Sequence, residues 1–233
     1  MNKNNSYEIV CKELKITVDN LFEVGLNKII WIGDKAKDRW GQMRENMNNP
    51  DFNFYVRSHG KNGNGNDKML NVLEKVFGRT FITDSTNNSK PKKILNDALK
   101  ETGKYEDYQI SHIFEERTNN PLLFTAPWMI CYTPKIIDPF TGHETKGYPK
   151  FREKFVEVAF NKNQKYIEDY NNIIMHFWEK LKEYIDGSDN KDYYDKFNKH
   201  MIATLAPIKK EYEKMQDKER REKYVDDFSD LKL

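Results

Sequence analysis

The chain has 233 residues, and its 39 Lys and Arg against 37 Asp and Glu give a formal net charge of +2. This balance excludes a strongly basic protein that coats nucleic acid non-specifically, although it allows a nuclease that gathers its cations on one face. Two cysteines outside any CxxC pair, and no apolar stretch long enough for a signal peptide or a membrane span, predict a cytoplasmic protein with no disulfide framework, zinc finger or membrane contact.

The first half of the chain alternates predicted helices with short predicted strands. Apolar residues at helical or alternating spacing define these elements, and Gly, Pro and polar loops separate them. The predicted helices cover residues 7–32 (one or two helices, broken near Gly25), 35–47, 68–77 and 94–101, and the predicted strands lie at 52–60 and in the first part of 79–93. The Gly-rich stretch 60–67 between them is predicted as a flexible connector.

The second half changes from strands to helices. Two short apolar runs at 108–114 and 129–134 predict a pair of strands. After these runs, aromatic and aliphatic residues recur at helical spacing, which predicts a helix over 150–185 and another over 192–215, interrupted near Pro207.

This order of elements predicts an α+β protein with a mostly helical C-terminal half. We expect three parts: an N-terminal α/β part able to recognise DNA at 1–104, a compact central motif at 105–149, and a helical part at 150–233.

The central segment carries the residues best suited to chemistry. If "YQISHIF" is a strand, its alternation places His112 on the same face as Tyr108 and Ile110. The connection to the next strand, "EERTNNPLLFTAPW", is longer than a tight hairpin needs. Long ordered loops on a rigid scaffold often hold functional groups, so we expect a site where this strand meets this loop.

The run "ISHIF", the Asn-containing loop and the run "WMICYTP" together resemble the hairpin of the His-Asn-His (ββα-metal) nucleases, over residues 108–147. The resemblance implies a metal-dependent DNA endonuclease, of the restriction or phage-defence type, with a ββα-metal-like hairpin set among helices. His112 would be the general base that takes a proton from water, which suits an imidazole of pKa ~6.5. Asn119 or Asn120 would orient it.

The same resemblance implies one divalent ion, Mg²⁺ or Mn²⁺, which neutralises charge on the phosphate. By position, His143 would be a metal ligand, with Glu144 or Asp138 as alternatives. The family has an acid or a histidine directly before the general base, where this chain has Ser111.

The expected partner is double-stranded DNA, and a homodimer is compatible with it. Arg57, His59, Lys61 and Arg117 are predicted to contact phosphates or bases, because Arg suits bidentate readout of guanine. Trp128 is a predicted stacking platform for a base, against the alternative that it anchors the core.

Other interpretations stay open. His112 is also explained as a strand histidine held by a backbone carbonyl, and Asn119 and Asn120 as turn residues. Asp138 followed by "ETK" at 144–146 fits a nuclease of the Asp…(Glu)xLys metal type. The helices that interleave aromatic with basic residues fit a non-catalytic nucleic-acid-binding protein, and a scaffold without such a role is a further alternative.

Overall fold

The computed structural model describes residues 6–58, 67–86, 88–100, 105–114, 117–141, 148–187 and 201–209. These residues form a mixed fold of helices and two small sheets, which confirms the expected α+β class at this coarse level. No helix within them is long and apolar enough to cross a membrane.

The larger sheet has three antiparallel strands in the order β1 (Ile30–Trp31), β5 (Ile130–Pro134) and β4 (Tyr108–His112). The central strand β5 has buried side chains on both of its faces, as its nearly unbroken apolar sequence indicates. The strands predicted at 108–114 and 129–134 are therefore confirmed as a hairpin, and β1 adds a third strand from the region predicted to be helical.

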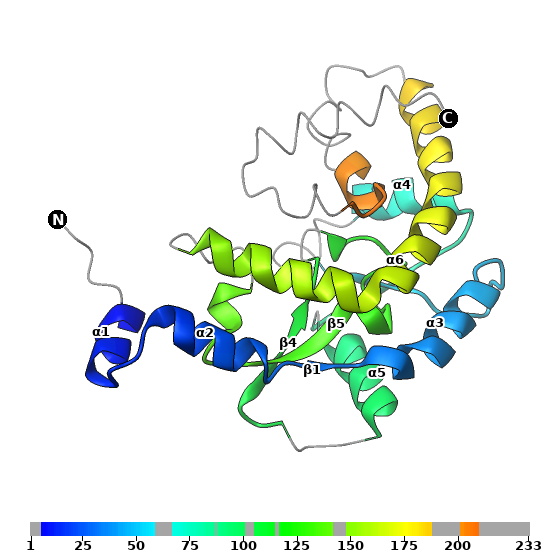
Figure 1. Ribbon diagram of the computed structural model, residues 1–233. Helices are drawn as coiled ribbons and strands as arrows, with labels where there is room; N and C mark the ends of the chain where they lie inside the picture. Colours follow the sequence, from blue (N-terminus) through cyan, green and yellow to red (C-terminus); the bar gives the residue numbers. More distant parts are fainter. Residues whose placement is uncertain are drawn as a thin grey trace.

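Each face of this sheet is covered by a different helix. On one face Trp31 stacks on Phe155 of α6 (Pro149–Asp186), with ring centroids 5.7 Å apart. On the other face the Tyr132 hydroxyl donates to Asn96 Oδ1 of α5 (Ser89–Leu99) at 2.6 Å. Figure 1 shows α6 crossing one side of the sheet and α5 lying on the other.

A second, parallel unit joins β2 (Tyr55–Arg57), α4 (Asp67–Phe77), β3 (Ile82–Asp84) and α5 in chain order. Helix α5 begins at Ser89, five residues before the predicted start, because Asp84 supplies acceptors for its first turn. Asp84 Oδ2 accepts from the Lys90 N–H at 2.8 Å, and its Oδ1 accepts from Ser89 Oγ at 2.7 Å. The turn from β3 into α5 is thus fixed by one carboxylate.

The N-terminal region forms two helices, α1 (Ser6–Glu13) and α2 (Val18–Leu26), followed by α3 (Ala36–Glu45) after β1. The expected break near Gly25 is wrong. The break lies between the first two helices, where Thr17 caps α2 by accepting from the Asn20 N–H at 3.0 Å. Gly25 lies inside α2, where only glycine fits, because a Cβ there would come within 2.3 Å of the Ile137 side chain.

One hydrophobic cluster extends through all three predicted parts of the chain. It includes Phe22 of α2, Leu95 of α5, Met129 beside β5 and Ala159 of α6. The predicted boundaries at 104 and 149 therefore do not separate independent cores. Helix α6 matches the helix predicted over 150–185, and residues 201–205 are helical, inside the helix predicted over 192–215.

Candidate functional site

His112 is the last residue of β4, as the strand prediction requires. The half-buried ring lies 3.1 Å from the Phe124 carbonyl oxygen through Nε2, and it stacks on the Phe124 ring at 5.5 Å between centroids. A carbonyl only accepts hydrogen bonds, so Nε2 carries the proton and a neutral ring has its lone pair on Nδ1. The long connection between the strands thus fixes both the orientation and the tautomer of this imidazole.

The two asparagines predicted to orient His112 are buried in that connection. Asn120 is fully buried; its amide donates to Tyr170 Oη at 2.8 Å and to the Thr204 carbonyl at 3.1 Å, and its Oδ1 accepts from the Leu122 N–H at 2.9 Å. Asn119 is 5% exposed. The Asn120 amide therefore joins the connection to α6 and to residues 201–209, and the Phe124 carbonyl is a contact that orients His112.

Ser111 and Asp138 lie together on the opposite side of the sheet from His112. Ser111 Oγ donates to Asp138 Oδ1 at 2.6 Å. Because successive strand residues point to opposite faces, this pair is on the α6 face with Cys131, whereas His112 is on the α5 face with Tyr132. Complete burial raises the pKa of the Cys131 thiol to about 12, so that thiol stays neutral at physiological pH.

The metal ligands predicted from the resemblance are not assembled in the part of the chain that the structure describes. No group of three His, Cys, Asp or Glu side chains is placed there to hold a metal ion. Asp138 is separated from His112 by the sheet, and His143 and Glu144 lie outside the described residues. The described residues alone therefore do not make up the metal site that the resemblance implies, and ligation by His143 and Glu144 stays a prediction.

Two residues predicted to contact DNA are interior residues. The Arg117 guanidinium is fully buried and donates to the carbonyls of Ala206 and Pro207, the latter at 3.1 Å. Trp128 is 1% exposed and meets Trp40 edge to face, with ring centroids 5.5 Å apart. Neither side chain offers surface to a nucleic acid in this conformation, so the prediction of DNA contacts does not fit their placement, and the core interpretation of Trp128 does.

The other residues predicted to contact DNA lie in sequence at the last residue of β2 and shortly after it. Arg57, its last residue, is half-buried and donates to Thr118 Oγ1 at 3.3 Å, which ties this strand to the connection beside His112. His59 and Lys61 lie outside the described residues.

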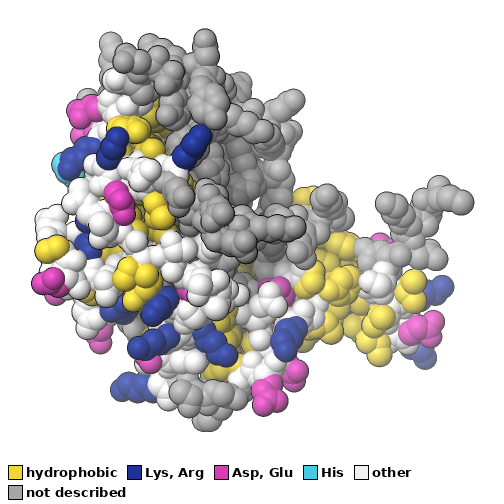
Figure 2. Space-filling model, turned by 180° about the vertical axis from the view of Figure 1, so that it is seen from behind, with side chains coloured by type: hydrophobic (Ala, Val, Ile, Leu, Met, Phe, Trp, Pro, Cys, Tyr) yellow, Lys and Arg dark blue, Asp and Glu magenta, His cyan; other side chains and the backbone are white. Residues whose placement is uncertain are grey.

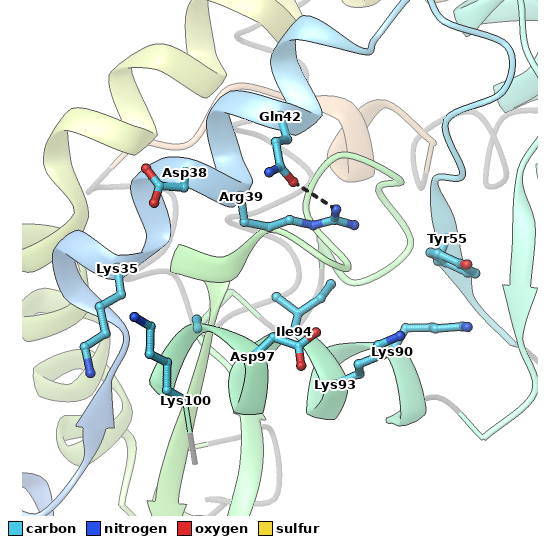
Figure 3. A pocket seen from close by; sticks show the side chains of 11 residues that line it. Lys35, Asp38, Arg39, Gln42, Tyr55, Lys90, Lys93, Ile94, Asp97 and Lys100 are labelled. Carbon is cyan, nitrogen blue, oxygen red and sulfur yellow. Dashed lines mark hydrogen bonds between the residues drawn. The ribbon is translucent and has the colours of Figure 1, made fainter. Parts of the chain in front are cut away.

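Sequence reasoning missed a pocket of about 650 Å³ between α3 and α5. Ile94 and Ala98 form part of its lining, and Tyr55 of β2 closes one end (Figure 3). Its charged lining is mostly cationic, with five cations and two acids. The cations are Lys35, Arg39, Lys90, Lys93 and Lys100, and the acids are Asp38 and Asp97. Figure 2 shows Lys and Arg side chains gathered on the part of the surface where α3 and α5 lie.

The sequence does hold a signal for this pocket. Each of the two helices contributes lining residues at the spacing i, i+3, i+4 and i+7, namely 35, 38, 39 and 42 on one helix and 90, 93, 94 and 97 on the other. Such a stripe normally reads as a solvated helix face. Only the packing of α3 and α5 around the connection shows that the two charged stripes face each other.

The carboxylate at the start of α5 is charged at neutral pH. Burial alone would raise the pKa of Asp84, but hydrogen bonds from the Lys90 N–H, Ser89 and Thr86 outweigh it and hold the pKa below its usual range. Its four acceptor contacts are all used by the turn, so Asp84 is a structural acid.

Comparison with other proteins places the chain among relatives by sequence. No solved structure matches it. A protein of Pasteurella multocida (strain Pm70), described as Uncharacterized protein PM1201, is 33% identical over 220 residues, which cover 90% of this chain and all of the relative. The family described as Uncharacterised protein PM1201 matches residues 32–229. With most of its length matched in both comparisons, the chain belongs to the PM1201 family.

Proposed function

We propose that this protein is a DNA endonuclease of the restriction or phage-defence type, with His112 as the general base. The observation that carries the proposal is the hydrogen bond from His112 Nε2 to the Phe124 carbonyl at the end of β4. A histidine that is to accept a proton at one ring nitrogen needs its other nitrogen held by an acceptor, and this contact meets that need.

The proposed reaction is hydrolysis of a phosphodiester by water. His112 Nδ1 takes a proton from the water, the water oxygen forms a bond to phosphorus, and the bond from phosphorus to the leaving oxygen breaks. The leaving oxygen then takes a proton from solvent. The antiparallel hairpin of β4 and β5, with a long connection folded back on the histidine, agrees with the arrangement implied by the resemblance to His-Asn-His nucleases.

The divalent ion of that family is part of the proposal only as a condition varied in the experiment. The described residues do not supply a ligand set, so no step is assigned to a metal. Stabilisation of phosphate charge by protein groups would come from cations such as Arg57, which lies on the strand whose end meets the connection.

The test is cleavage of supercoiled plasmid DNA by the full chain, with Mg²⁺, with Mn²⁺ and with EDTA. We expect cleavage in at least one metal condition, and a loss of about 10²–10⁴-fold in rate for His112→Ala. His176→Ala is the matched control, because that histidine is exposed on α6 and touches only the edge of Phe177 among its described ring contacts.

Circular dichroism of both variants establishes that they are folded. Full activity of a folded His112→Ala variant would refute the general base, and intact DNA in every condition with the unmodified protein would refute the nuclease. Cleavage that survives His112→Ala but fails in Asp138→Asn would favour the Asp…(Glu)xLys chemistry.

A non-catalytic nucleic-acid-binding protein is the second candidate, and the cationic pocket between α3 and α5 is the observation that favours it. It predicts a gel shift of duplex DNA without cleavage in any metal condition, and no effect of His112→Ala on that shift.

A further inference from the structure

We propose that the pocket between α3 and α5 binds phosphate groups of a nucleic-acid backbone. The identity of the ligand as DNA rests on the proposed function, whereas the preference for phosphate rests on the pocket itself. None of the residues predicted from the sequence to contact DNA lines this pocket, so it adds a separate binding surface.

The first argument is that the five cations of the pocket outnumber its two acids and form no close ion pairs among the described residues. Elsewhere lysines pair with acids at short range, as Lys150 does with Asp19 and Lys165 with Asp34, both at 2.5 Å. Within the described residues, none of the five cations that line the pocket has a carboxylate within 4 Å of its charged nitrogens. Like charges gathered around one hollow repel each other, and an anion relieves that repulsion.

Arg39 supplies the second argument, because its guanidinium is built into the pocket with unused donors. The side chain is half-buried, and Nε is buried without a hydrogen-bond partner among the described residues. Its hydrogen bond to Gln42 Oε1 is long, at 3.4 Å. A buried charged donor that lacks an acceptor costs free energy, and a phosphate oxygen is the acceptor that a guanidinium binds best.

The third argument is the arrangement of the other cations around Arg39. Figure 3 shows Lys35 and Lys100 at one end of the pocket, Lys90 and Tyr55 at the other, and Arg39 reaching between them. Lys90 is held over the Tyr55 ring, 4.6 Å from its centroid, which fixes its direction. Cations distributed along a groove suit a chain of phosphates better than a single compact anion.

The pocket also lies on the same side of the sheet as His112. Asn96 of α5 bonds to Tyr132, and the pairing of Tyr132 with Ile110 places the His112 side chain on this α5 face. A DNA strand held between α3 and α5 is therefore not separated from His112 by the sheet, as it would be from Asp138.

The test measures binding of a fluorescent 20-base-pair duplex, in EDTA, by the full chain and by the double variant Arg39→Gln, Lys93→Ala. The control is the double variant Lys150→Ala, Lys165→Ala, which loses the same charge from ion pairs on α6. We expect the slope of log K against log salt to fall by about 2 for the pocket variant, with binding weakened by roughly tenfold for every duplex sequence, and little change for the control.

A second arm measures binding of inorganic phosphate and of a mononucleotide by calorimetry. Loss of duplex binding in the pocket variant alone identifies the backbone of DNA as the source of phosphate. Loss of mononucleotide binding, with duplex binding unchanged, also supports a phosphate site but identifies a free nucleotide as the source. Equal binding of all three ligands by the pocket variant and the unmodified protein overturns the proposal.

The outcome is separable from that of the nuclease proposal. If the nuclease proposal fails and the pocket proposal holds, no DNA is cut in any condition, yet the pocket variant still loses duplex binding. If only the pocket proposal fails, cleavage still depends on His112 and duplex binding is the same in both double variants.

Discussion

Two polar regions of this molecule use similar side chains in opposite ways. Within the connection between β4 and β5, Arg117 and Asn120 are fully buried, and their donors meet the carbonyls of residues 204, 206 and 207. Between α3 and α5, Arg39 and its neighbouring lysines are partly exposed and outnumber the two acids beside them, and none forms an ion pair within 4 Å among the described residues. A polar side chain whose donors are satisfied holds the fold, and one whose donors are not satisfied is available to a ligand.

The contrast is sharpest for arginine. The Arg117 guanidinium is held by main-chain carbonyls, whereas that of Arg39 lies over the Phe52 ring, 5.2 Å from its centroid, and makes a long hydrogen bond to the exposed Gln42 amide. If the contrast is correct, changes in the first region reduce stability, and changes in the second reduce binding without reducing stability.

The largest effect on stability is expected for Arg117→Ala. The change removes the Arg117 donor from the buried Pro207 carbonyl, leaves the Ala206 carbonyl with only a long hydrogen bond from Tyr170 Oη at 3.4 Å, and opens a cavity, so the free energy of unfolding should fall by about 3–5 kcal/mol. Urea denaturation measures it. Arg44→Ala is the matched control, since that arginine is half exposed in its ion pair with Asp169, and its loss should cost less than about 1 kcal/mol. A similar small loss for both variants would contradict the contrast.

An intermediate effect is expected for Asp84→Ala, which tests the carboxylate at the start of α5. Loss of its hydrogen bonds to the Lys90 N–H and to Ser89 should lower stability by about 1–3 kcal/mol at neutral pH. The pKa of Asp84 is held below its ordinary value, so its contribution is present above the unfolded pKa of about 3.9 and is lost as pH falls through the lower folded pKa.

Denaturation at pH 7 and below pH 4 measures that difference. The two proteins should converge in stability as the solution becomes more acidic. Asp51→Ala is the control, an exposed aspartate whose substitution should change stability by less than about 0.5 kcal/mol at either pH. A gap between Asp84→Ala and the unmodified protein that widens at low pH would contradict the account.

The smallest effect, and one of opposite sign, is expected for Lys100→Gly. Lys100 ends α5 with φ of 55°, a left-handed conformation that glycine adopts without steric cost. The variant should be more stable by about 1 kcal/mol in thermal denaturation, while its duplex binding becomes weaker and less salt-dependent. If the Lys100→Gly variant is more stable but binds duplex DNA as tightly as the unmodified protein, Lys100 does not contact the ligand of the pocket.

Much of the fold could be predicted from the sequence because long periodic segments specify their own structure. Helix α6, the hairpin of β4 and β5, and helix α4 lie within a residue or two of their predicted bounds. The errors arose where a distant residue decides the local structure. The start of α5 depends on Asp84 five residues earlier, and Gly25 marks a close contact of α2 with Ile137 and not the end of a helix.

The site was less predictable than the fold. The position of His112 at a strand end follows from alternation, but its partner is the carbonyl of Phe124, and a backbone carbonyl has no signature in sequence. Asp138 and His112 are separated because they lie on opposite sides of the sheet, and their sides could be assigned only from the pairing register of the strands. Charged stripes on α3 and α5 were visible, but only tertiary packing brings them together.

The contacts that hold residues 201–209 have a consequence for how this segment can change over evolutionary time. Arg117, Asn120 and Asn171 recognise its main-chain atoms: Asn171 donates to the Ile208 carbonyl at 3.0 Å and accepts from its N–H at 2.7 Å. Main-chain atoms are common to nearly all amino acids, so these contacts themselves set no requirement on side-chain identity. Most side chains of the segment are buried, however, so substitution is easiest at positions 202, 203 and 209, which are partly exposed. A segment changed at those three positions should therefore dock with its backbone in the same place.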